Sequence, residues 1–152
     1  MKILKELLTK PFQKPVNKGI VIFLIAVAAV GFFDAAYLTI QHFMNVIPPC
    51  TIDGCETVLA SAYAEVAGVP VALLGAVYYL SIMVLLIAYL DSKKEALLRW
   101  ALAITALGFL ASIYFFILQA WVIKAYCQYC LLSATTSTIL FITAIAIFKK
   151  AK

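Results

Sequence analysis

The chain has 152 residues, of which 66% are apolar and only 12% are charged, and its formal net charge is +5. Soluble domains carry about 45–50% apolar and about 25% charged residues, so this composition excludes an ordinary soluble fold and indicates one integral membrane domain. The basic residues flank apolar segments, a pattern that favours membrane topology over nucleic-acid binding as the reason for the positive charge.

Four apolar segments are long enough to cross a membrane, and they cover approximately residues 20–43, 70–90, 96–123 and 127–148. Each provides at least about 20 residues, which suffices for a hydrocarbon core of about 30 Å at a rise of about 1.5 Å per residue. Because lipid supplies no hydrogen-bond partner to the backbone, each segment should be a helix. The predicted fold is an all-α, four-transmembrane-helix bundle over residues 1–152, with an outer loop over 45–69.

The first helix carries polar side chains inside or near the membrane. Asp34 lies within the segment with Tyr37 one turn later, and an intramembrane carboxylate is by default a candidate functional group that faces the bundle interior. Its alternative role is that of a packing acid bonded to a neighbouring helix. His42, the only histidine, lies near the outer end, where it could pass a proton or simply be a satisfied interfacial side chain.

The outer loop holds the first pair of cysteines, Cys50 and Cys55. The turn formed by Asp53 and Gly54 lets the chain fold back and bring the two sulfurs together. Taken alone, such a pair is more often a loop staple than a catalyst. Residues 56–64 are good helix formers with one apolar side, and they predict a short interfacial helix that could cover the space between the bundle helices.

The second pair, Cys127 and Cys130, opens the last apolar segment. Their spacing places both sulfurs on one helix face, about one turn apart, so they can close a disulfide or open to attack another one. A helix that begins here also favours the reactive thiolate through its N-terminal amides and dipole. A flexible dithiol in a loop beside a dithiol at the N-terminus of a helix predicts a relay of electrons by thiol–disulfide exchange.

Other roles for the four cysteines follow from the same residues. A haem attachment site requires a histidine after the second cysteine of the motif, and Leu131 stands there, so this site is excluded. Purely structural disulfides, within or between the pairs, are an alternative. A zinc site built from four converging thiolates is another, although an oxidising compartment disfavours it.

The basic residues predict the orientation of the chain in a cell membrane. Those of the N-terminal arm, the connection between the second and third helices, and the tail are Lys2, Lys5, Lys10, Lys14, Lys18, Lys93, Lys94, Arg99, Lys149, Lys150 and Lys152. Of the 12 basic residues only Lys124 falls on the other side. The positive-inside rule then places both termini in the cytoplasm and all four cysteines on the outer face, where disulfides form and persist.

One ordered set of residues runs through most of the chain. It consists of Cys50 and Cys55, Ser61, the run Gly68-Val69-Pro70, Gly75 with Tyr78-Tyr79, and Cys127-Gln128-Tyr129-Cys130. In these residues and their order the chain resembles the vitamin K epoxide reductase family, in its prokaryotic disulfide-forming branch. The resemblance extends from Gly31 to the end of the last helix.

The resemblance implies a bound quinone (menaquinone, ubiquinone or a related type) near the outer face and a direction for the electrons. Cys130 would face the quinone, and Cys127 would exchange with Cys55. Cys50 would complete the loop disulfide that oxidises a thioredoxin-like partner. The implied activity is that of a quinone-dependent thiol oxidoreductase that drives disulfide formation outside the cytoplasm. Because the chain ends at Lys152 without a fused thioredoxin-like domain, we expect the partner to be a separate protein.

Five further positions are candidates for contact with the quinone. Ser61 occupies the place of a family hydroxyl close to the active cysteines, and Tyr78 and Tyr79 could line a ring pocket. Val71 and Ala134 match positions where the animal enzymes place hydrogen-bonding side chains against the quinone, and here both are apolar. Vitamin K quinone or epoxide reduction is therefore the less favoured alternative. A non-catalytic four-helix membrane protein with structural disulfides is the alternative from another class.

Two more kinds of side chain could take part in the same pocket. His42 could hydrogen-bond the quinone. Aromatic residues along the helices could line a ring pocket, although helix packing or an interfacial belt is the commoner explanation for any single one. Besides the two tyrosines already named, they are Phe32, Phe33, Tyr114, Phe115, Phe116 and Trp121.

Overall fold

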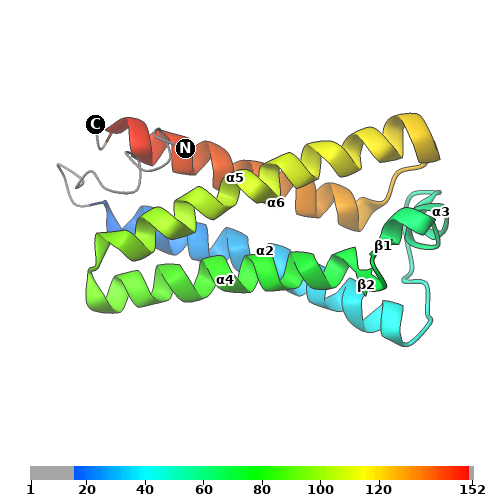
Figure 1. Cartoon of the computed structure of the whole chain (residues 1–152), viewed down its shortest axis with the longest axis horizontal. Helices are drawn as coiled ribbons and strands as arrows, with labels where there is room; N and C mark the ends of the chain where they lie inside the picture. The colour runs from blue at the N-terminus through cyan, green and yellow to red at the C-terminus, as the bar shows by residue number, and fades with distance from the viewer. Residues whose placement is uncertain (1–15, 151–152) are drawn as a thin grey trace.

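The computed structural model describes residues 16–150 and contains four long helices that lie lengthwise beside one another (Figure 1). They are α2 (Lys18–Phe43), α4 (Val71–Ser92), α5 (Glu95–Ile117) and α6 (Gln128–Lys150). All four are long and apolar enough to cross a membrane, the third when the π-helical segment Leu118–Ile123 that continues α5 is included. The prediction of an all-α, multi-pass membrane protein is confirmed, and each helix lies within a few residues of its expected bounds.

The bundle is held by contacts of α2 and of α5 with both α4 and α6. Its core consists mainly of aliphatic side chains, among them Val21, Leu24, Leu86, Leu98 and Leu140. Large apolar side chains also cover the outside of every long helix, for example Phe33, Val84, Leu107 and Ile142. Helices that are apolar on all sides are those of a membrane span, where the outer face meets lipid.

The outer loop contains short elements in place of the one helix expected over residues 56–64. Helix α3 (Cys55–Leu59) is followed by a 3-10 turn (Ala62–Ala64) and by a small antiparallel hairpin of β1 (Glu65–Val66) and β2 (Val69–Pro70). The expected helix was too long because Ser61 interrupts it. Its hydroxyl donates a hydrogen bond to the Val58 carbonyl at 2.7 Å and its backbone is extended, which is the usual competition between serine and the helix ladder.

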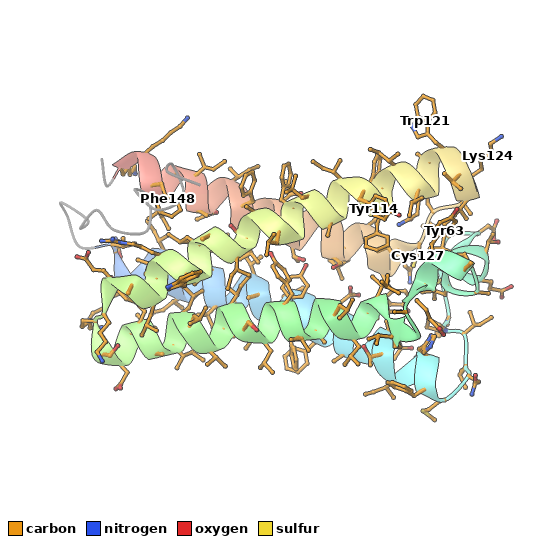
Figure 2. The ribbon with its side chains drawn as sticks, viewed as in Figure 1. Tyr63, Tyr114, Trp121, Lys124, Cys127 and Phe148 are labelled. Atoms are coloured by element: carbon orange, nitrogen blue, oxygen red, sulfur yellow. A yellow bond between two sulfur atoms is a disulfide. The ribbon has the colours of Figure 1, made fainter. Side chains whose placement is uncertain are left out.

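The two ends of the bundle differ in charge. The beginning of α2, the end of α6 and the α4–α5 connection lie at one end, and the outer loop and the turn into α6 lie at the other (Figure 1). The first end carries the described basic residues except one, namely Lys18, Lys93, Lys94, Arg99, Lys149 and Lys150, whereas Lys124 lies at the second end (Figure 2). Lys2, Lys5, Lys10, Lys14 and Lys152 lie outside the described residues. The sidedness inferred from these charges stays a prediction.

Candidate functional site

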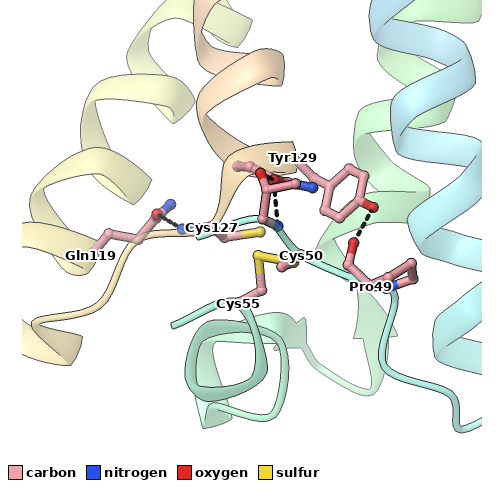
Figure 3. The surroundings of a disulfide bond; sticks show 8 residues. Pro49, Cys50, Cys55, Gln119, Cys127 and Tyr129 are labelled. Atoms are coloured by element: carbon pink, nitrogen blue, oxygen red, sulfur yellow. Dashed lines mark hydrogen bonds between the residues drawn. A yellow bond between two sulfur atoms is a disulfide. The ribbon is translucent and has the colours of Figure 1, made fainter. Parts of the chain in front are cut away.

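The structure brings all four cysteines together at the second end of the bundle. Cys50 and Cys55 form a disulfide, and Cys127 and Cys130 are free thiols. Cys55 is 1% exposed and Cys127 is 0% exposed, and the two belong to one buried cluster against which Cys50 and Cys130 pack. Figure 3 shows the Cys127 side chain directed toward the loop disulfide. Residues far apart in the sequence thus form one compact sulfur site.

The disulfide loop fits tightly against the turn that leads into α6. Gly54 has a φ of 116°, a left-handed conformation that favours glycine, and it forms the expected turn after Asp53. A Cβ atom on Gly54 would lie 3.1 Å from the Cβ of Ala125 and 3.2 Å from the backbone N and O of Tyr126. The absence of a side chain at Gly54 therefore lets the loop approach the Cys127 motif closely.

The two residues between Cys127 and Cys130 hold the loop in place. The Oε1 atom of Gln128 accepts hydrogen bonds from the backbone N–H of Thr51 at 3.0 Å and from its Oγ1 hydroxyl at 2.5 Å. The hydroxyl of Tyr129 donates to the carbonyl oxygen of Pro49 at 2.8 Å (Figure 3). These three bonds attach the segment on both sides of Cys50 to the first turn of α6.

A buried amide fixes the position of Cys127 itself. Gln119 lies in the π-helical segment and is 3% exposed, and its Oε1 atom accepts the backbone N–H of Cys127 at 3.0 Å. Its carbonyl accepts the N–H of Ala125 at 3.2 Å, while Lys124 between them takes a left-handed φ of 56°. Sequence reasoning missed Gln119, although an amide inside an apolar segment is a usable signal of a specific hydrogen bond.

The surroundings of Cys127 favour its thiolate. The hydrogen bond with the Cys130 side chain lowers the pKa of Cys127 to about 7, and backbone N–H groups of Cys130 and Tyr129 act in the same direction. Burial and the negative charge of Asp34 oppose this shift. Because Cys127 immediately precedes α6, its sulfur also lies at the positive end of a helix, as expected from the sequence.

Beside the sulfur site lies a large cavity between the helices, beneath the outer loop. Its volume is about 1120 Å³, and the thiol that lines it is that of Cys130 rather than Cys127. All five residues expected to contact a quinone line this cavity, namely Ser61, Val71, Tyr78, Tyr79 and Ala134. Phe115 and Phe116 also line it, whereas Phe32, Phe33, Tyr114 and Trp121 do not. Trp121 points away from the bundle (Figure 2).

Tyr79 is anchored deep in this cavity wall. Its ring is seated on Gly31 of α2, where a Cβ atom would overlap the ring. Its hydroxyl lies 2.8 Å from the carbonyl oxygen of Ser133, 3.1 Å from the Oγ of the same residue and 2.8 Å from the Oγ1 of Thr136. Tyr79 is 1% exposed, so these contacts fix both its ring and its hydroxyl.

Tyr78 is placed by a similar arrangement on the other side of α4. Its ring crosses Gly108 of α5, and its hydroxyl lies 3.4 Å from the Oγ of Ser137 on α6. Ser137 lines the cavity together with the two tyrosines. The cavity wall below Cys130 therefore combines aromatic rings with a row of hydroxyl groups on α6.

Asp34 and His42 line different depths of the same cavity. Asp34 is 8% exposed, and its Oδ2 atom has no hydrogen-bond partner among the described residues. It faces the bundle interior as expected, but that oxygen is not bonded to a neighbouring helix. The Nε2 of His42 lies 3.1 Å from the Oε1 of Glu65 in the hairpin, so the histidine has a partner where the outer loop meets α2.

Comparison with known proteins gives one family. The model described as "Vitamin K epoxide reductase family" matches residues 22–145, which is most of the chain. A search of the curated proteins returned no match. Within residues 16–150, no three or more His, Cys, Asp or Glu side chains gather in a way that could hold a metal ion.

Proposed function

The chain belongs to the vitamin K epoxide reductase family, and from this premise we propose that it is a quinone-dependent thiol oxidoreductase that reoxidises a separate thioredoxin-like partner. Members of this family are oxidoreductases that use a quinone as electron partner. The proposal is carried by one observation, the spatial order of the four cysteines, which gives the electrons a direction. The first is partly exposed in the loop, the middle two are buried against each other, and the last lines the cavity. Disulfide formation outside the cytoplasm is the expected outcome.

Electrons enter at Cys50. It is the partly exposed half of the loop disulfide, whereas Cys55 is buried against Cys127. A thiolate of the partner protein can therefore reach Cys50, and its attack releases Cys55 as the leaving thiolate. The second thiol of the partner then displaces Cys50, so the partner leaves with a disulfide and the loop holds two thiols.

The loop dithiol next reduces the disulfide between Cys127 and Cys130. Cys55 attacks Cys127 and releases the Cys130 thiolate, and Cys50 then closes the loop disulfide again and releases Cys127. A leaving thiol with a pKa of about 7 departs faster than an ordinary thiol, so the hydrogen bond that lowers the pKa of Cys127 assists this step. The structure, with the loop disulfide closed and two free thiols beside it, corresponds to the end of this exchange.

The cavity fits a quinone. Its volume of about 1120 Å³ is slightly above the usual range of about 300–1,000 Å³ for ligand pockets, and aromatic and aliphatic side chains line most of it. Tyr78 and Tyr79 would flank the ring, and Cys130 would face it from the first turn of α6. A bound quinone supplies an acceptor for two electrons and two protons, which is what oxidation of two thiols to a disulfide releases.

We also infer that the sulfur site faces the outside of the cell and that both termini lie in the cytoplasm. The concentration of described basic residues at the opposite end of the bundle supports this orientation. An outward-facing Cys50 would meet a partner in an oxidising compartment, where a newly formed disulfide persists.

The order of the relay can be tested by trapping its intermediate. In a Cys130→Ser variant, Cys127 can attack Cys55, and no Cys130 thiol is present to release Cys55 by attacking Cys127. The mixed disulfide between Cys127 and Cys55 can then revert only through Cys50, so it should accumulate to a detectable level. Peptide mapping under non-reducing conditions identifies it, and the Cys127→Ser variant is the control. A mixed disulfide between Cys127 and Cys50 instead, or none at all, contradicts the proposed order.

A further inference from the structure

We propose that Asp34 moves protons between the Cys130 thiol and a quinone held in the cavity. This role rests on the proposed function and adds to it a group that neither the cysteine chemistry nor the family match assigns. Three observations carry it: the burial of the carboxylate with an unpartnered oxygen, its position in the cavity that Cys130 lines, and the engagement of the hydroxyl groups nearby.

The first observation is that Asp34 is a buried carboxylate with an oxygen that has no hydrogen-bond partner among the described residues. It lies within membrane-spanning helix α2 and is 8% exposed, and its Oδ2 has no hydrogen-bond partner within residues 16–150. A buried polar atom that lacks a partner is rare in folded proteins, and an ionisable side chain within a membrane span generally marks a site of function. Asp34 thus lines the cavity, while one oxygen of its carboxylate keeps no partner in the described protein.

The second observation is that Asp34 lines the same cavity as the reacting thiol. Helix α2 packs against α4 and α6. On α4 the titratable group close to Asp34 is that of Tyr79, and at the start of α6 they are those of Cys127 and Cys130. Asp34 interacts electrostatically with Cys130 and with Tyr79, and both line the cavity with it. The cavity therefore joins the carboxylate to the thiol.

The third observation is that other polar groups of the cavity are already engaged. The hydroxyl of Ser61 donates to the Val58 carbonyl, and the hydroxyl of Tyr79 lies among oxygen atoms of α6. Among the described residues that line the cavity, the other acid is Glu65, which pairs with His42. Asp34 is thus the cavity acid with an oxygen that no described group engages.

The proposed step balances in protons and electrons. Oxidation of the Cys127 and Cys130 thiols to a disulfide breaks two S–H bonds, forms one S–S bond and releases two electrons and two protons, which a quinone takes up as it becomes a quinol. The Asp34 carboxylate accepts the proton from Cys130 as the thiolate forms, and then gives it up inside the cavity. The carboxylate returns to its starting state after each turnover.

The test compares Asp34→Asn with Asp34→Glu, and with Asp91→Asn as a control that removes an exposed acid at the far end of α4. In pre-reduced protein given a soluble short-chain quinone, Asp34→Asn should lower the rate of quinol formation by about 100-fold or more, the size of general acid–base effects. Asp34→Glu should restore part of the rate. Formation of the mixed disulfide between Cys55 and Cys127 in the Cys130→Ser background should be unchanged, because it needs no proton from Asp34.

A second readout needs no quinone. Infrared difference spectra between the oxidised and reduced forms of the Cys127–Cys130 pair should contain a carboxyl band that shifts in D₂O and disappears in Asp34→Asn. A parent protein that forms no quinol refutes the proposed function itself. An active parent with an Asp34→Asn rate within about twofold overturns the role of Asp34 alone. So does the lack of any carboxyl band that shifts in D₂O in the parent protein, a result that needs no folded variant.

Discussion

The hydrogen bonds that attach the disulfide loop to α6 give a prediction with a calculable size. Tyr129→Phe removes the bond to the Pro49 carbonyl, and Gln128→Leu removes the acceptor shared by two groups of Thr51. All of these groups can turn to solvent when the loop leaves α6. Each variant therefore loosens the loop without leaving a buried polar atom unpaired.

The expected magnitude follows from the number of bonds lost. A typical intramolecular hydrogen bond contributes about 1 kcal/mol net, so Tyr129→Phe should lower the equilibrium constant for docking of the loop by about fivefold. The double variant Gln128→Leu/Tyr129→Phe loses three hydrogen bonds. Two of them share one acceptor, so their free energies are not fully additive. Its docking free energy should fall by about 2–3 kcal/mol, or about 30- to 150-fold in the docking constant.

Amide hydrogen exchange of residues 50–59 measures this constant directly, because the exchange rate follows the open population even when that population is small. Tyr126→Phe is the matched control, since its hydroxyl forms no hydrogen bond among the described residues. The same variants should slow formation of the mixed disulfide between Cys55 and Cys127. Unchanged protection of the loop in the double variant refutes the view that Gln128 and Tyr129 position it.

Three further predictions concern single positions. With the loop disulfide closed, the thiolate absorbance of Cys127 should be low below pH 7, half of its maximum near pH 7 and full above it. Cys130→Ala removes the side-chain hydrogen bond to Cys127, so it should raise the midpoint of this titration. Gly54→Ala, at a φ of 116°, should cost about 1–3 kcal/mol in loop docking, seen as lost amide protection. Gly31→Ala should displace the Tyr79 ring and lower the free energy of unfolding, measured in detergent, by about 1–3 kcal/mol. A melting temperature equal to the parent's contradicts the close contact between Gly31 and the Tyr79 ring.

The helices could be predicted from the sequence because the bilayer fixes their length and requires internally bonded backbone. The meeting of the cysteine pairs could be anticipated because the order of the helices predicts both pairs at one end of the bundle. The end of α3 at Leu59 could not be predicted, since it depends on whether the Ser61 hydroxyl bonds to the backbone or to solvent. Local helix propensity alone favoured the longer helix.

The tertiary contacts of the site were beyond sequence reasoning for a different reason. Gln119 and Gln128 act on groups that only the folded turn and loop bring within reach, so no local pattern shows their partners. The interior position of Asp34 was predictable from its place in an apolar helix. The lack of a hydrogen-bond partner for its Oδ2 among the described residues was not predictable, because it depends on which side chains of α4 and α6 lie beside Asp34.

The central claim is that electrons pass from an external dithiol through the four cysteines to a quinone. The most direct test is the stoichiometry of the purified protein in lipid, supplied with a reduced dithiol and a quinone, with quinol followed by absorbance. We predict one quinol for each disulfide formed, and loss of this reaction in both Cys127→Ser and Cys130→Ser. Quinol formation that persists in Cys130→Ser, or a parent protein that forms none, contradicts the account.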